Sequence, residues 1–130
     1  MAKKQRGLLV HFLWFWLPVL GYITMIFVLS AQPNLQSPFH FQNGDKLAHI
    51  LEYGGLGILL ARALHGSRPA SAAMSVSLIA LLIGMAIGIG DELFQAGVPG
   101  RDSNPLDFLA DTTGLVLAQM LFLGFQALRD

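Results

Sequence analysis

Four long apolar segments alternate with short polar ones along the chain. They cover about residues 8–30, 45–65, 72–96 and 106–128. A helix of about 20 apolar residues crosses the roughly 30 Å hydrocarbon core of a bilayer, because each residue adds about 1.5 Å. The pattern therefore predicts an all-α, polytopic membrane protein with four transmembrane helices in a single domain.

The connections between these segments contain residues that end helices. Pro33 and Pro38 lie in the first connection, the stretch 66–69 forms the second, and Pro99 lies in the third. The first apolar segment follows Lys3, Lys4 and Arg6, as in a signal peptide. It is longer than an ordinary signal-peptide core and lacks a good cleavage site, so we expect an uncleaved helix.

That first helix contains Pro18 and Gly21, where a slight bend is expected. A soluble helical domain is the alternative to a membrane protein. It would need charged outer faces, which the stretches 8–29 and 72–90 lack. The whole chain is 54% hydrophobic and only 12% charged, which favours the membrane class.

The charge and the cysteine content limit the kinds of partner and site that the sequence can support, and the positions of Lys and Arg predict the membrane orientation. The formal net charge is zero, so bulk electrostatics do not indicate a nucleic-acid partner. The absence of cysteine excludes disulfides and thiolate metal sites. The cationic residues before the first helix, Arg62 and Arg68 near the second connection, and Arg129 after the last helix predict that both termini are cytoplasmic (N-in/C-in).

Ionisable residues open the second helix on one face. Asp45, Lys46, His49, Glu52 and Tyr53 fall within an arc of about 120° if each residue turns the helix by roughly 100°. An ionisable group at membrane depth costs about 2.5–3.5 kcal/mol on the lenient insertion scale, so this face should turn inward. The simpler alternative is an Asp45–His49 pair one turn apart, with Lys46 reaching the interface.

The other polar groups lie where the third helix ends and the fourth begins. The stretch 91–111 holds five of the eight acidic residues. One helical stripe runs from small to polar residues, Gly84, Gly88, Asp91 and Gln95, and a second runs from acidic to small residues, Asp107, Asp111, Gly114 and Ala118. The predicted topology brings the polar ends of both stripes, the start of the second helix and Arg101 to the outer end. Three distant pieces of sequence should thus build one site.

The motifs Asp45-Lys46-x-x-His49-x-x-x-Tyr53, Asp91-Glu92-x-x-Gln95-x-x-x-Pro99-Gly100-Arg101 and Asp107-x-x-x-Asp111-x-x-Gly114 carry a family resemblance. In this order they resemble the VanZ-like family of small bacterial membrane proteins, over about residues 22–124. The resemblance implies a multi-pass protein of the bacterial cytoplasmic (inner) membrane. The family is named for a protein associated with low-level teicoplanin resistance, a cell-envelope phenotype. Many members have Asn where this chain has Asp111.

We expect two groups of site residues. His49, Asp91, Glu92, Asp107 and Asp111 are the candidate catalytic groups, because imidazole and carboxylates exchange protons. Lys46, Tyr53, Gln95 and Arg101 are the candidate anion-binding or substrate-binding groups, since Arg suits bidentate contact with phosphate. The acids could also hold a hard divalent cation such as Mg²⁺, with the ligand set left open.

These groups suit three functions. The leading hypothesis is an outer-facing site that binds, and in one version hydrolyses or transfers, an anionic lipid or polyprenyl-phosphate headgroup. Its partners would be membrane lipids or a lipid-linked cell-wall precursor. The sequence has no P-loop and no Gly-x-Ser-x-Gly elbow to support catalysis. The alternatives are a binding or assembly protein whose charges form a structural ion-pair network and, less favoured, a small proton-coupled exporter. Oligomeric state is not predicted.

Overall fold

A computed structural model describes residues 2–101 and 103–129. It does not describe Asp102, which belongs to the acidic stretch 91–111, or the side chain of Lys3, one of the cationic residues before the first helix. Its helices are α1 (Ala2–His11), the π-helical turn η1 (Phe12–Trp16), α2 (Leu17–Ser30), α3 (Gly44–Ser67), α4 (Ala73–Ala96) and α5 (Pro105–Ala127). The first three run on from one another without a break, so that the described residues form four helices long and apolar enough to cross a membrane. Within the described residues there is no strand, which confirms the all-α prediction.

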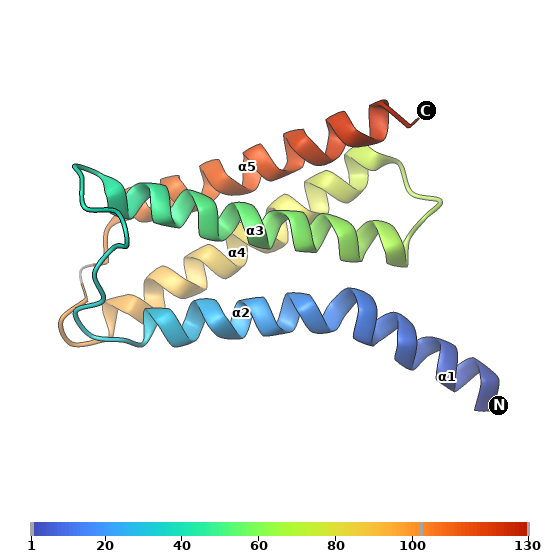
Figure 1. The fold of residues 1–130 in the computed structure, drawn as a ribbon, viewed down its shortest axis with the longest axis horizontal. Helices are drawn as coiled ribbons and strands as arrows, with labels where there is room; N and C mark the ends of the chain where they lie inside the picture. The colour runs from blue at the N-terminus through green and yellow to red at the C-terminus, as the bar shows by residue number, and fades with distance from the viewer. Residues whose placement is uncertain (1, 102, 130) are drawn as a thin grey trace.

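The four long helices lie side by side, with the polar loops together (Figure 1). The connections 31–43 and 97–104 meet at one end, which we call the polar end. The turn 68–72 and both termini lie at the opposite end. The distribution of Lys and Arg still predicts that the termini face the cytoplasm.

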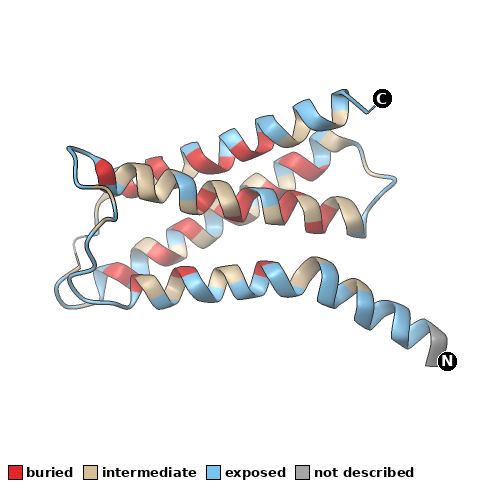
Figure 2. Cartoon of the chain, in the orientation of Figure 1, coloured by how far each residue is buried: buried red, intermediate tan, exposed pale blue. Residues whose placement is uncertain are grey.

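Large apolar side chains lie on the outside of the bundle and acidic ones are buried inside it. Figure 2 shows which parts of each helix are exposed and which are buried. Leu82, Leu93 and Leu121 expose 66%, 72% and 67% of their surface, whereas Asp91 and Asp111 expose 1% and 0%. Water would disfavour such a surface, and the hydrocarbon of a bilayer would not. The helices therefore have the surface of a membrane bundle.

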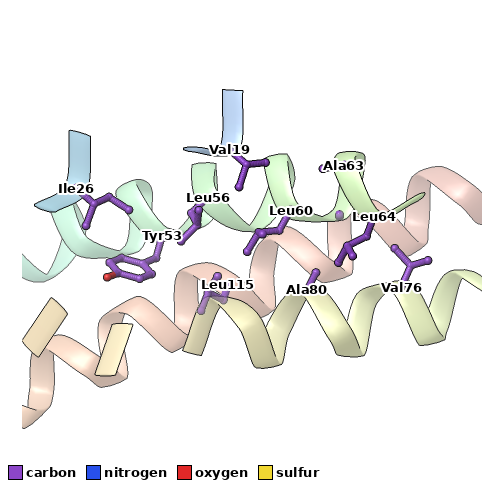
Figure 3. Close-up of a cluster of buried hydrophobic side chains, with 11 residues drawn as sticks. Val19, Ile26, Tyr53, Leu56, Leu60, Ala63, Leu64, Val76, Ala80 and Leu115 are labelled. Atoms are coloured by element: carbon purple, nitrogen blue, oxygen red, sulfur yellow. The ribbon is translucent and has the colours of Figure 1, made fainter. Parts of the chain in front are cut away.

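The hydrophobic core follows one face of α3 (Figure 3). Tyr53, Leu56 and Leu60 are at most 1% exposed. They share a cluster with Leu115 of α5, with Val19 and Ile26 of α2, and with Val76 and Ala80 of α4. Helix α3 is thus the central element, and its first two turns carry the polar face into the site.

Small residues let α3 and α5 approach most closely. A Cβ atom added to Gly57 would lie 2.7 Å from Cβ of Ala118, and one added to Gly114 would meet the Ile50 carbonyl and stand 2.8 Å from the Gly54 nitrogen. Both distances are too short for carbon, so these contacts require glycine. The predicted small-residue stripe of the fourth helix packs against α3 of the same chain.

The first helix changes direction between α1 and α2 (Figure 1), in the turn that precedes Pro18, whereas the sequence predicted a slight bend at Pro18 and Gly21. The π-helical turn Phe12–Trp16 makes the bend, and there the Leu17 N–H donates to the Phe12 carbonyl. Proline has no N–H, so the Trp14 carbonyl lacks its usual donor four residues later. Arg62 Nη1 donates to that carbonyl at 2.8 Å and thereby joins the bend to α3.

Candidate functional site at the polar end

A buried triad connects α2 to the end of α4. Ser30 Oγ donates to Asp91 Oδ1, and Gln95 Nε2 donates to Ser30 Oγ at 3.0 Å and to Asp91 Oδ2 at 3.1 Å. The three residues are 3%, 1% and 2% exposed. Both Asp91 oxygens have partners, so the triad satisfies a buried carboxylate within the bundle.

A second cluster joins the starts of α3 and α5. Lys46 Nζ lies 2.8 Å from Asp45 Oδ2 and also pairs with Asp107, which is buried. The alternative Asp45–His49 pair is therefore wrong, because Asp45 pairs with Lys46 and its side chain is 54% exposed. Lys46 instead offsets the Asp107 charge across the helix interface.

A third cluster draws on α3, α4 and α5. His49 Nδ1 lies 2.8 Å from Oδ1 of the fully buried Asp111. Glu92 completes the group, and one potential ligand atom from each of the three residues lies within 4.8 Å of the others. Of the four candidate catalytic carboxylates, Asp111 is the one that pairs with His49, because the close packing of α3 against α5 brings the two side chains together.

Local structure fixes where α5 begins. Asn104 caps the helix, and its Oδ1 accepts from the Leu106 N–H at 3.0 Å. Pro105 occupies the first turn, where a missing N–H costs nothing. Asp107 and Asp111 then lie one turn apart on the buried face of α5.

The two loops of the polar end are joined by a backbone hydrogen bond, and Arg101 is the residue after this bond in the second loop. The Asn34 N–H donates to the Gly100 carbonyl at 3.2 Å, and both residues have positive φ, 56° and 79°. Glycine adopts such angles readily, and Asn more readily than most residues. The contact ties the loop after α4 to the loop after α2, which sets the starting point of the Arg101 side chain.

A cavity of about 480 Å³ opens between α2, the loop after it and the start of α3. Met25, Leu29 and Phe39 contribute apolar wall. The polar wall consists of Ser30, Gln36, Ser37, Asp45, His49, Glu52, Gln95 and Arg101. One cavity thus has both an apolar wall and polar groups from three chain segments.

The predicted site residues divide between this cavity and the interior. His49, Gln95 and Arg101 line the cavity, and Glu92 and Asp111 lie against His49. Lys46, Tyr53 and Asp107 are not in the cavity wall. Tyr53 is fully buried, and its hydroxyl has no hydrogen-bond partner among the described residues.

Three polar residues that matter here were not among the predicted site residues. Glu52 lay on the polar arc of the second helix and lines the cavity. Ser103 Oγ donates to Glu92 Oε2 at 3.1 Å from within the acidic stretch. Ser30 carried no sequence signal, because a serine at the end of an apolar helix is ordinary.

Replacing Ser30 with alanine tests the structural role of the triad. The change removes the hydroxyl that contacts both Asp91 and Gln95, so we expect the free energy of unfolding to fall by about 1.5–3 kcal/mol. Denaturation in mixed detergent measures it. Thr24→Ala on the exposed face of the same helix is the control, and equal stability of the two variants would contradict this role.

The fold and the site together define a class: a multi-pass helical membrane protein with polar side chains gathered at one end of the bundle. The chain belongs to the VanZ/LLP1 family, whose sequence profile matches residues 4–126. That match confirms the resemblance drawn from the three motifs. No curated protein and no solved structure matches the chain.

Proposed function

We propose that the protein binds the phosphate of an anionic lipid, of the polyprenyl-phosphate class, in the cavity at the polar end. The observation that carries this proposal is the composition of the cavity wall. Apolar side chains of α2 and a set of polar residues that includes Arg101 line the same cavity. A lipid has the same two parts, an apolar chain and a phosphate headgroup.

Arg101 is the cation best suited to that phosphate. Lys46 already pairs with Asp45 and Asp107, and Arg62 donates to the Trp14 carbonyl. Arg101 forms no salt bridge with any residue that the structure describes. A guanidinium can donate two parallel hydrogen bonds to a phosphate, which a neutral headgroup cannot accept as strongly.

Glu52 adds selectivity to the same wall. Its Oε1 atom is buried and lacks a hydrogen-bond partner among the described residues. A buried unpaired acceptor is unfavourable, so a ligand that donates a hydrogen bond there would be stabilised. The hydroxyl groups of a sugar-bearing or glycerol headgroup supply such donors, as do those of a lipid-linked cell-wall precursor.

Arg101→Ala is the direct test. Loss of a hydrogen bond between charged groups, worth about 1.5–3 kcal/mol, should weaken binding roughly tenfold to a hundredfold. Native mass spectrometry or fluorescence titration would compare polyprenyl phosphate, phosphatidylglycerol and the phosphate-free polyprenol. Arg68→Ala is the matched control, because Arg68 is exposed at the opposite end.

Two results would refute the proposal: Arg101→Ala binding like the wild type, or polyprenol binding as tightly as its phosphate. The same samples, assayed for released inorganic phosphate, separate binding from hydrolysis. A transfer reaction would instead change the lipid headgroup without releasing phosphate.

A structural network is the second candidate function, and the Ser30–Asp91–Gln95 triad favours it. Every polar atom of Asp91 is satisfied inside the protein, which is what a register-fixing network requires. If this network were the whole role of the charges, Arg101→Ala and Arg68→Ala would leave lipid binding equally unchanged. The two candidates are thus separated by one comparison.

A further inference from the structure

We propose that His49, Glu92 and Asp111 form a binding site for a divalent transition-metal ion of the Zn²⁺ or Mn²⁺ class. Each residue comes from a different helix, and one potential ligand atom from each lies within 4.8 Å of the others. Metal–ligand distances of about 2.0–2.2 Å place two ligands of one ion roughly 3–4.4 Å apart. The three side chains therefore need only a small contraction to share an ion. This inference goes beyond lipid binding and does not depend on it.

Each of the two carboxylates in this cluster has one buried oxygen atom without a hydrogen-bond partner among the described residues. Asp111 is fully buried, and its Oδ2 atom has no hydrogen-bond partner among the described residues, although Oδ1 meets His49. Glu92 is partly buried and also has one unpaired oxygen atom. Ser103 donates to its Oε2 atom, while its buried Oε1 atom has no hydrogen-bond partner among the described residues. An unsatisfied buried carboxylate oxygen is costly, and a cation would satisfy both atoms at once.

The free Asp111 oxygen points toward the helix that carries Glu92. Oδ2 lies 3.6 Å from the position that a Cβ atom would take on Gly88, one helical turn before Glu92 on α4. The missing side chain at Gly88 thereby leaves room between α4 and α5. Two carboxylates and an imidazole thus converge from three helices.

The local charge also calls for a cation. Neither Glu92 nor Asp111 forms a salt bridge with a Lys or Arg of the described chain, and Lys46 is already held by two other acids. Two carboxylates therefore face a single imidazole. Like charges this close in a low-dielectric interior repel one another, and a divalent ion would turn that repulsion into attraction.

The ligand types select the metal class. Mg²⁺ and Ca²⁺ prefer oxygen ligands throughout, whereas imidazole suits Zn²⁺ and other first-row transition metals. One nitrogen and two oxygen ligands leave further coordination positions for solvent or a phosphate oxygen. The Mg²⁺ expected from the acids alone is therefore less suited to this set than Zn²⁺ or Mn²⁺.

Electron paramagnetic resonance with Mn²⁺ tests the site in the full chain, purified in a phosphate-free maltoside detergent. We expect one bound ion per chain, displaced by Zn²⁺, with a spin-echo modulation from one coordinated ¹⁴N. His49→Ala should abolish the nitrogen signal, and Glu92→Gln should weaken Mn²⁺ binding at least tenfold. His40→Ala, which alters an exposed loop histidine at the same end, should change neither.

The design keeps folding and lipid binding separate from the result. Glu92→Gln retains a side-chain oxygen for Ser103, so it should stay folded even if Asp111→Asn does not; thermal denaturation checks each variant. A folded wild type that binds no Mn²⁺, or binding without nitrogen modulation, or equal binding by Glu92→Gln, would overturn the metal site. None of these results would alter the Arg101 comparison, because no lipid phosphate is present.

Discussion

Replacing Gly114 with alanine should push α5 away from α3 and destabilise the whole bundle. The new methyl group would overlap the Ile50 carbonyl and stand 2.8 Å from the Gly54 nitrogen. Backbone atoms of a central helix cannot turn aside as a flexible side chain can. Overpacking costs about 1–3 kcal/mol in well-packed cores, and we expect the upper end of that range here.

Gly124→Ala on the same helix is the matched control, since nothing lies within 4 Å of a Cβ atom at that position. Both changes add one methyl group and the same gain in helix propensity. Thermal denaturation of the two purified proteins in one detergent gives the comparison. We expect Gly114→Ala to melt well below the wild type and Gly124→Ala to match or exceed it.

Gly114→Ala should also disturb the candidate site, because two of its side chains lie on the helices that this change pushes apart. His49 belongs to α3 and Asp111 to α5, and their 2.8 Å contact depends on the close approach that Gly114 permits. Gly114→Ala should therefore also weaken metal binding in any fraction that remains folded. If Gly114→Ala and Gly124→Ala were equally stable, the two helices would pack less closely than the structure shows.

Replacing Lys46 with methionine should be the most damaging change to a single charge. It would leave Asp107, which is 6% exposed, without its cation at the helix interface. Removing one partner of a buried ion pair costs about 3–5 kcal/mol, because the remaining charge has neither water nor a counterion. Partial exposure of the Lys46 side chain, 21%, places the expectation at the lower end.

The double variant Lys46→Met with Asp107→Leu provides the internal control. Removing both charges leaves no unpaired group, so the double variant should recover most of the lost stability. Unfolding in mixed detergent would measure all members of the cycle. A single variant as stable as the wild type would mean that solvent, rather than Lys46, stabilises Asp107.

This outcome also bears on which cation binds the ligand. If Lys46 stabilises the α3–α5 interface, its loss should lower the yield of folded protein without changing the lipid affinity of that protein. Arg101→Ala should do the reverse. The two variants therefore distinguish Lys46, which stabilises the fold, from Arg101, which binds the ligand, although both residues carry a positive charge.

The sequence by itself determined the four membrane helices, since apolar segments of bilayer length between Pro and Gly residues have few other structures available. It also placed Asp107, Asp111 and Gly114 on one stripe of α5 and His49 on the inner face of α3, because helical periodicity follows directly from residue spacing. The three motifs were enough to identify the family. The roles of these residues stay predictions.

Only the tertiary structure decided which groups meet. His49 pairs with Asp111 and lies near Glu92, and Ser30 joins Asp91 from the first helix, where the sequence showed no sign of a polar contact. Periodicity defines the face on which a side chain lies, but a partner also depends on how far one helix slides and rotates against the next. That offset depends on how small residues such as Gly114 fit against the backbone of the facing helix. The spacing of residues within one helix does not predict this fit.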